Sequence, residues 1–216
     1  MDAQHDELEG AIAFSVQLSQ LQQGLAFNLR LNSQAHQMAA AYFAIAVDHR
    51  EGLLLLVRAG AYSPAFALVR SIYEALMRGT WAYFCAPEDQ CKHAYKTGVL
   101  PKFDTIVQRL DKLEKSKGVF GRSRDLAWAS YCDFAHGLMR QVTRWIAPDA
   151  IRPQHNPEEV ADLLTIADAH YLQALIAMAW IAEQPRDGMQ AAQEELLRRF
   201  RERKAGKAQE SPGSAD

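Results

Sequence analysis

Apolar residues recur every three or four positions over long stretches of the chain, which is the period of an amphipathic helix. The pattern is clearest between Met38 and Leu56, where Tyr42, His49 and several aliphatic residues fall along one face of a single helix. Proline and glycine interrupt the chain only at wide intervals, and no segment alternates apolar and polar residues as a half-buried strand does. The pattern therefore predicts an all-α fold.

Capping residues set the expected limits of the helices. Asn32 or Ser33 suits the N-cap of the second helix, and Gly60 suits the position just after its end. Ser63, followed by proline, can cap the third helix, and Asn156, also followed by proline, can cap a late one. We expect helices at about 6–25, 33–59, 64–86, 88–95, 101–117, 123–136 with a continuation to 146, 157–183 and 189–204, with residues 119–121 as a loop.

The turn between the second and third helices is very short, so these two helices should form a long antiparallel hairpin. The expected fold is a helical bundle with an up-and-down arrangement, built around the hairpin at about 33–59 and 64–86. Residues 1–204 are long enough for a single domain with its core at about 33–183. The small polar residues 205–216 predict a disordered tail.

Charge and cysteine usage narrow the class of protein. The 216 residues carry a formal net charge of -2, so no overall field draws the chain to nucleic acid or acidic membranes. Cys85, Cys91 and Cys132 are widely spaced and odd in number, which suits reduced thiols in the cytoplasm. The acidic start does not predict a signal peptide, and the apolar runs at 52–57 and 171–182 are too short to span a bilayer. We expect a cytoplasmic protein with no membrane contact.

The third helix carries the most informative charges. Arg70, Glu74 and Arg78 are four residues apart, so they share one helical face among large apolar side chains. One interpretation is structural: Arg70 and Glu74 form an ion pair that fixes helix packing. The other is functional: the arginines bind an anion such as phosphate, and Glu74 orients them or takes part in catalysis. The sequence leaves both interpretations open.

His49 interrupts the apolar face of the second helix. In the predicted hairpin this position lies toward the end that meets the middle of the third helix. His49 is therefore either a histidine of the core or part of a polar pocket near Arg70 or Glu74.

A third polar element lies at the end of the helix that precedes Gly137. Asp133 and His136 are three residues apart and share a face, and Arg140 and Arg144 continue the polar side. His136 could act as a general acid or base, with the arginines as phosphate anchors. The alternative is an exposed polar helix end with basic residues near its C-terminus.

Other kinds of site find no sequence support. The chain has no glycine-rich phosphate loop, no dinucleotide fingerprint and no nucleophile elbow. It also lacks the paired histidine and carboxylate spacings of metal sites in helical bundles. We therefore expect neither a metal nor a cofactor.

Three segments in order resemble a group of uncharacterised bacterial helical proteins, some of which have been compared with HEPN domains. The segments are His49 with the leucine-rich run after it, residues 65–75 (AFALVRSIYEA) and residues 134–137 (FAHG), and the likeness spans about residues 40–145. It implies a small helical bundle, often dimeric, and for many HEPN proteins a metal-independent ribonuclease activity in toxin–antitoxin or phage-defence systems. The HEPN signature, an arginine followed four to six residues later by a histidine, occurs only at Arg30 and His36, outside these segments.

Two functional hypotheses follow. In the first, the protein cleaves RNA or binds nucleotides without a metal, with Arg70 on phosphate, Glu74 positioning it and His136 as acid or base. In the second, it is a non-catalytic module that binds a protein partner, and its buried charges are structural. A small-molecule pocket lined by aromatic residues is a third possibility, and a homodimer fits each of them. The candidate pocket aromatics are Tyr42, Tyr73, Trp81 and Trp128.

Overall fold

The computed structural model describes residues 3–210, with side chains at 5–202 and 205, as an assembly of helices without a strand in that range. A single isolated bridge joins Ile146 and Ile151. The all-α prediction is confirmed. The elements are α1 (Ala3–Gln23), α2 (Gln34–Arg58), α3 (Tyr62–Phe84), α4 (Glu88–Thr97), α5 (Phe103–Asp111), α6 (Val119–Ala135), α7 (Met139–Val142), the short 3-10 helix η1 (Thr143–Trp145), α8 (Pro157–Ile181) and α9 (Asp187–Glu210).

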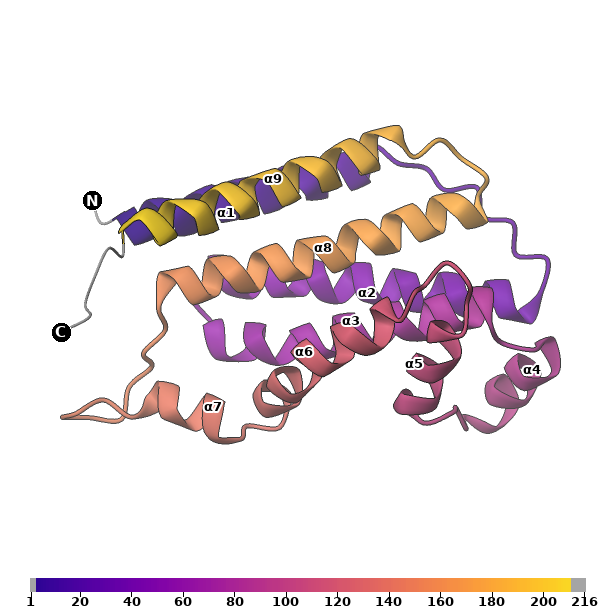
Figure 1. Ribbon diagram of the computed structural model, residues 1–216, viewed down its shortest axis with the longest axis horizontal. Coiled ribbons are helices and arrows are strands. Elements are labelled where there is room, and N and C mark those ends of the chain that lie inside the picture. The colour runs from indigo at the N-terminus through magenta and orange to yellow at the C-terminus, as the bar shows by residue number, and fades with distance from the viewer. Residues whose placement is uncertain (1–2, 211–216) are drawn as a thin grey trace.

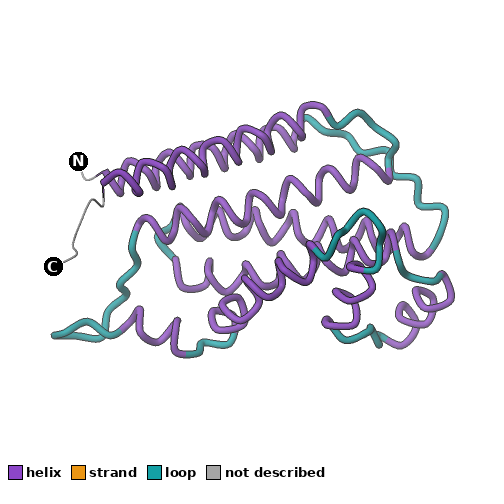
Figure 2. Tube along the Cα trace, viewed as in Figure 1, coloured by secondary structure: helices purple, strands orange, loops and turns teal. Residues whose placement is uncertain are grey.

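Helices α2, α3 and α8 form the centre of the bundle (Figure 1). Helix α8 packs against both arms of the α2–α3 hairpin, and α1 and α9 pack against α8. On the other side, α5 and α6 pack on α3, and α4 packs on α2. The trace in Figure 2 shows the long loop after α7, which returns the chain to the start of α8. The bundle built around a helical hairpin is therefore confirmed.

The two arms of the hairpin run antiparallel in very close contact. A Cβ atom at Gly79 would lie 2.6 Å from the ring of Phe43, and one at Gly52 would lie 3.8 Å from Leu68. Residue 43 on α2 thus faces residue 79 on α3, and residue 52 faces residue 68. The two pairs define an antiparallel register of α2 against α3. The turn passes through Gly60, whose φ of 71° lies in the left-handed region that glycine adopts without strain. Glycine is thus used for close approach at one end of the hairpin and for the turn at the other.

The buried face of α2 lies one position away from the stripe expected from the sequence. The fully buried residues are Ala39, Phe43, Ala46, Arg50 and Leu53, whereas Ile45 is 42% exposed. Alanine lets neighbouring helices approach closely, so this face packs against the rest of the bundle even though it carries fewer large side chains. His49, which the sequence places on the apolar stripe, is only half-buried.

Two predicted caps are confirmed and one is wrong. The Ser33 side chain accepts a hydrogen bond from the backbone N–H of His36, and Asn156 accepts one from Glu158. Ser63, however, lies inside α3, whose first residue is preceded by Ala61 without a side-chain cap. The Ser63 hydroxyl instead accepts a hydrogen bond from Trp145 Nε1 at 3.1 Å, because the loop after α7 folds back onto this end of α3.

Helix α6 begins earlier than the sequence predicts. Residues 119–121, expected to form a loop, are its first turn. The Asp111 carboxylate accepts hydrogen bonds from the backbone N–H groups of Phe120 (3.0 Å) and Gly121 (2.9 Å). The cap thus comes from the end of α5, and a tertiary contact supplies what the local sequence lacks.

The end of the chain and α8 also differ from expectation. Helix α9 continues through Glu210, whereas the sequence predicts that a disordered tail begins at residue 205; residues 211–216 lie outside the described part. Of the described helices, only α8 is long and apolar enough to cross a membrane as a whole, although 56% of its apolar window is buried inside the bundle. A core helix of a soluble protein passes the same test.

Candidate functional site

Arg70 on α3 and His136 at the C-terminal cap of α6 meet directly. Arg70 Nη1 donates a hydrogen bond to His136 Nε2, so this ring nitrogen carries no proton in the arrangement observed. His136 is exposed, whereas the Arg70 side chain is only 25% exposed. The pair therefore presents an unprotonated imidazole nitrogen and a guanidinium at the surface between α3 and α6.

Glu74 connects this pair to Arg78. Its carboxylate lies 2.5 Å from Arg78 Nη2 and 3.8 Å from Arg70 Nη2, so it binds Arg78 more closely. Tyr42 on α2 lies near the same charges: burial raises the pKa of its hydroxyl, while Arg78 lowers it and Glu74 raises it. The predicted charged triplet thus exists as an i,i+4 ladder on α3, half-buried against α2.

Aromatic rings hold the arginine from the other side. The Arg70 guanidinium lies 5.0 Å from the centroid of the Trp128 ring on α6, and Trp128 stacks on Phe103 of α5 at 4.2 Å. Such a cation–π contact restricts the arginine without neutralising its charge. Arg70 Nε is buried and has no hydrogen-bond partner among the described residues. Arg70 thus keeps its full charge in a fixed position.

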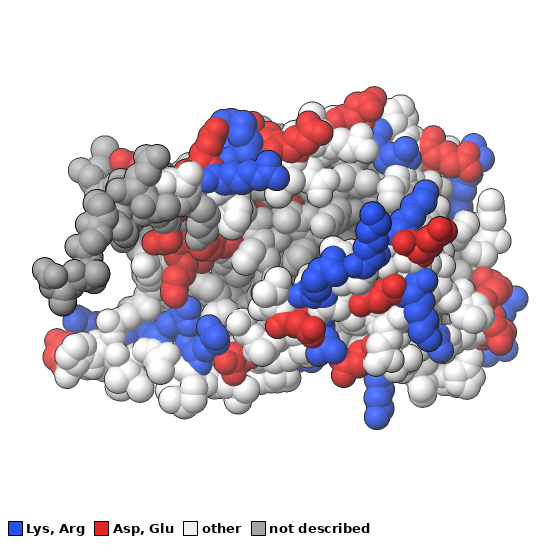
Figure 3. All heavy atoms as spheres, viewed as in Figure 1, with Lys and Arg blue, Asp and Glu red and all other residues white. Residues whose placement is uncertain are grey.

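The predicted residues after His136 pair with acids. Arg140 Nε lies 3.3 Å from Asp133, and Arg144 Nη2 lies 3.0 Å from Glu159 at the start of α8. Basic side chains gather over α7 in Figure 3, with acidic ones over the adjoining end of α8. Arg144 also lies 4.8 Å from the centroid of the Phe134 ring, so its position is fixed by packing as well.

The sequence left open whether Arg70, Glu74, His136 and His49 meet, and the structure joins three of them. Arg70, Glu74 and His136 meet, whereas no hydrogen bond or ion pair within the described residues joins His49 to any of them. His49 Nδ1 is buried without a partner. The sequence identified the face of α3 that carries the charges, and the hydrogen bonds and ion pairs of this site do not include His49.

The sequence analysis missed the most deeply buried charges among the described residues. Arg50 on α2 is fully buried and binds Asp168 on α8, with Nε at 2.8 Å and Nη2 at 2.5 Å from Oδ1. Ser15 on α1 donates its hydroxyl hydrogen to Asp168 Oδ2 at 2.6 Å. Burial raises the pKa of the Asp168 carboxyl, and Arg50 and Ser15 oppose that rise. Three helices therefore meet at one hydrogen-bonded ion pair.

The remaining guanidinium hydrogens of Arg50 are also satisfied. Nη1 donates to Ser19 at 2.7 Å and to Glu51 at 2.8 Å, while Nη2 donates to the Ser15 carbonyl at 2.7 Å. The face of the guanidinium lies 4.4 Å from the centroid of the Tyr171 ring. A buried pair with every donor matched is expected to fix the relative positions of α1, α2 and α8.

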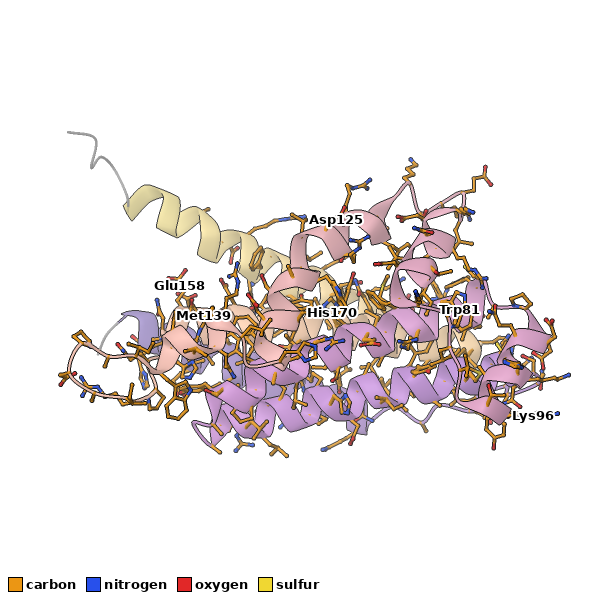
Figure 4. The ribbon with its side chains drawn as sticks, turned by 90° about the horizontal axis from the view of Figure 1, so that it is seen from below. Trp81, Lys96, Asp125, Met139, Glu158 and His170 are labelled. Atoms are coloured by element: carbon orange, nitrogen blue, oxygen red, sulfur yellow. The ribbon has the colours of Figure 1, made fainter. Side chains whose placement is uncertain are left out.

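The sequence analysis did not single out two further buried or half-buried histidines, His170 and His155. His170 on α8 lies near the centre of the molecule in Figure 4, and its ring centroid is 5.3 Å from that of Tyr73. Both its ring nitrogens are buried, and burial lowers its pKa to about 4, opposed in part by the side chain of Gln173. His155 lies beside Ser63, 3.2 Å from its hydroxyl, and burial, reinforced by Arg144, lowers its pKa. Both histidines favour the neutral form.

A signal for the buried pair was present in the sequence. Arg50 lies four residues after Ala46 and three before Leu53, and Asp168 lies four after Leu164 and three before Tyr171. Each charge thus interrupts a buried helical stripe, the same criterion that singled out Arg70. No group of three or more His, Cys, Asp or Glu side chains suited to a metal ion occurs within the described residues.

A family model for a family of unknown function, DUF6988, matches residues 43–203. The chain belongs to this family. No curated protein and no solved structure matches the chain. The expectation of an uncharacterised family is confirmed, while the finer likeness to HEPN domains stays a prediction based on the sequence motifs. The DUF6988 match includes both the Arg70–His136 site and the Arg50–Asp168 pair.

Proposed function

We propose that the protein is a metal-independent ribonuclease of the HEPN-like kind, acting in a bacterial defence or toxin–antitoxin system. The observation that carries the proposal is the contact between the Arg70 guanidinium and the unprotonated Nε2 of His136 at the surface. A guanidinium binds phosphate oxygens, and a neutral imidazole accepts a proton, so the two groups together match the needs of phosphodiester cleavage.

The charges around the site support an anionic ligand. Four arginines of the site (Arg70, Arg78, Arg140 and Arg144) face three carboxylates (Glu74, Asp133 and Glu159). Three of the arginines have a carboxylate within 3.3 Å, whereas the nearest one to Arg70 is 3.8 Å away and already binds Arg78. Arg70 is therefore the arginine with most charge left for a phosphate.

The reaction uses the ribose itself as the nucleophile. When a phosphate oxygen replaces His136 Nε2 as the acceptor of the Arg70 hydrogen bond, the lone pair of this ring nitrogen is freed. His136 Nε2 then takes the proton of the 2′-hydroxyl, the 2′-oxygen attacks the adjacent phosphorus, and the bond from phosphorus to the 5′-oxygen breaks. The leaving 5′-oxygen takes a proton from water, and the products are a 2′,3′-cyclic phosphate and a 5′-hydroxyl end. Arg70 stabilises the charge on the non-bridging oxygens, and Glu74 holds Arg70 and Arg78 in register.

The test is incubation of the purified chain with labelled RNA in a buffer containing EDTA. We expect cleavage with 2′,3′-cyclic phosphate ends, and none of 2′-O-methylated RNA. The His136→Ala variant should lower the rate by about 10²–10⁴-fold. Arg152→Ala is the matched control, because Arg152 is an exposed arginine that pairs with Asp149 away from His136.

The outcome that contradicts the proposal is absence of cleavage by the wild-type chain, or equal cleavage by wild type and His136→Ala. Binding of RNA without cleavage, abolished by Arg70→Ala, would reduce the function to nucleotide or RNA binding at the same site. Loss of activity in Arg152→Ala would show that a general loss of positive charge is responsible.

A second candidate function, a non-catalytic interaction module, is supported by the segment 138–151, which comprises α7, η1 and the start of the loop after them. Its apolar side chains are unusually exposed, including Met139 at 65% and Ile151 at 75%. Exposed apolar groups of this kind mark contact surfaces for partners, including a second copy of the chain. If this is the function, Met139→Glu combined with Ile151→Glu should convert a dimer to a monomer in light scattering, while Leu126→Glu, on an 85% exposed residue of α6, should not. A monomeric wild type excludes the dimer.

A further inference from the structure

A pocket of about 190 Å³ lies between α1, α8 and α9, on the opposite side of α8 from α3. Its walls come from α1, near the start of the chain, and from the consecutive helices α8 and α9. None of its residues belongs to the Arg70–His136 site. The volume is enough for a ligand of five or six heavy atoms, somewhat more than a benzene-sized cavity of about 150 Å³. The pocket is lined by Glu7, Gly10, Ala11, Phe14, Thr165, Asp168, Leu196, Arg199 and Phe200.

The floor of the pocket is acidic and deeply buried. Asp168 lines it and is only 1% exposed. Its carboxylate shares Arg50 with a second carboxylate, that of Glu51, at 2.5 Å and 2.8 Å from the guanidinium. Two carboxylates on one guanidinium leave this cluster with a net negative charge. Of the charged residues that line the pocket itself, Glu7 and Asp168 are acidic and Arg199 is basic, so the lining as a whole favours a cation.

The walls of the pocket include aromatic rings, and one of these rings already makes a cation–π contact within the protein. The Arg199 guanidinium lies 4.5 Å from the centroid of the Phe14 ring at the edge of the pocket. Arg199 Nε donates a hydrogen bond to Glu195 at 2.7 Å, and the same carboxylate also accepts hydrogen bonds from Arg198. Phe200 and Leu196 complete an apolar surface suited to methylene groups. Aromatic walls above a carboxylate are the arrangement that recognises alkylammonium ions.

We propose that this pocket binds a small primary alkylamine, with its ammonium group toward Asp168 and its alkyl chain between Phe14, Leu196 and Phe200. The ammonium group donates one hydrogen bond to Asp168 Oδ2, so that the carboxylate keeps its contacts with Arg50 through Oδ1 and with Ser15 through Oδ2. The site is independent of the proposed ribonuclease activity, because it rests on other residues on the far side of α8.

Gly10 offers a way to fill the pocket without touching the ion pair. A Cβ atom at Gly10 would meet no other atom within 4 Å, and the residue lines the pocket in the middle of α1. A methionine there would occupy the space of the ligand, and it would stabilise α1, because glycine is a poor helix former. Substitution of Asp168 is unsuitable, because it would break the buried pair with Arg50.

The experiment compares three probes of similar size and different charge: n-butylamine, 1-butanol and butyrate. Binding is followed by amide chemical shifts of Ala11 and Thr165 and by the melting temperature of the full chain. We expect n-butylamine to bind with a dissociation constant of about 1 mM, the range reached by ligands with few heavy atoms. Butanol and butyrate should bind at least about tenfold more weakly, since they lack the positive charge.

The Gly10→Met variant should bind n-butylamine at least about tenfold more weakly while its melting temperature rises. The matched control is Gly188→Ala in α9, where a Cβ also meets nothing within 4 Å but which does not line the pocket; it should bind within about twofold of wild type. Equal binding of amine and alcohol, unchanged binding by Gly10→Met, or no binding of n-butylamine at all would each overturn the proposal.

Discussion

Arg50 and Arg70 both lie on the hairpin, and each contacts a carboxylate and an aromatic ring. They differ in how far their side chains are buried and in how many of their hydrogen-bond donors have a partner. Arg50 is fully buried, and each of its guanidinium nitrogens donates a hydrogen bond to a residue of α1, α2 or α8. Arg70 is partly exposed, shares Glu74 with Arg78, and contacts an exposed histidine. We call the Arg50 network closed because every hydrogen-bond donor of the guanidinium has a partner in the bundle, and such a network stabilises the packing of the helices. We call the Arg70 site open because its guanidinium is partly exposed and can still bind a ligand. The two arginines therefore separate structure from proposed function within the same bundle.

The largest expected effect comes from breaking the closed network. Asp168→Ala leaves the Arg50 charge buried without its principal partner, and we expect the free energy of unfolding to fall by about 3–5 kcal/mol. Urea denaturation followed by circular dichroism measures it. Glu159→Ala, which removes a 47% exposed carboxylate bound to Arg144, is the control and should change it by less than about 1 kcal/mol. If the two substitutions lowered the free energy of unfolding equally, the buried Arg50–Asp168 pair would not be more stabilising than an exposed ion pair, and the comparison would be wrong.

The second prediction concerns the pH dependence of stability that follows from burial of His170. The pKa of His170 is about 4 in the folded chain and about 6.5 when unfolded, so the unfolded state binds a proton first as the pH falls. Stability is fully present above pH 6.5 and should decrease by about 3 kcal/mol between pH 6.5 and pH 4. His170→Phe should remove most of this dependence in denaturation curves at pH 6.5 and 4.5. A variant that keeps the wild-type dependence would show that another group titrates.

The third effect tests the rigidity of the hairpin that carries both arginines. Gly79→Ala places a methyl group 2.6 Å from the fully buried ring of Phe43, so the ring or the helices must shift. We expect a loss of about 1–3 kcal/mol in the free energy of unfolding, despite the better helix propensity of alanine. Gly10→Ala, in the same kind of helix but facing open space, should instead stabilise the chain. A neutral Gly79→Ala would indicate that α2 and α3 can separate slightly without cost.

The smallest expected effect concerns the open site. Arg70→Ala leaves Glu74 bound to Arg78, so the free energy of unfolding should change by less than about 1 kcal/mol, while RNA cleavage should fall by about 10²-fold or more. Thermal denaturation and the cleavage assay, run on the same preparation, give both numbers. A sharp loss of stability with no loss of activity would reverse the assignment and make Arg70 a structural residue.

Much of the fold could be predicted because local signals were strong. Ser33 and Asn156 act as the caps that their residue types favour, and the short turn at Gly60 produces the antiparallel hairpin. The start of α6 was wrong because its cap, Asp111, belongs to another helix. The buried face of α2 was misjudged because large apolar residues were weighted above alanine, and that error concealed Arg50.

The sequence by itself determined the helical class, the hairpin and the face of α3 that carries Arg70, Glu74 and Arg78, because periodicity and capping act over a few residues. The tertiary structure decided which charges meet. Asp168 and Arg50 are 118 residues apart, and His136 and Arg70 are 66 apart. Nothing in a local pattern specifies which helix faces pack together, so only the packed bundle makes one arginine a closed core pair and the other an open site.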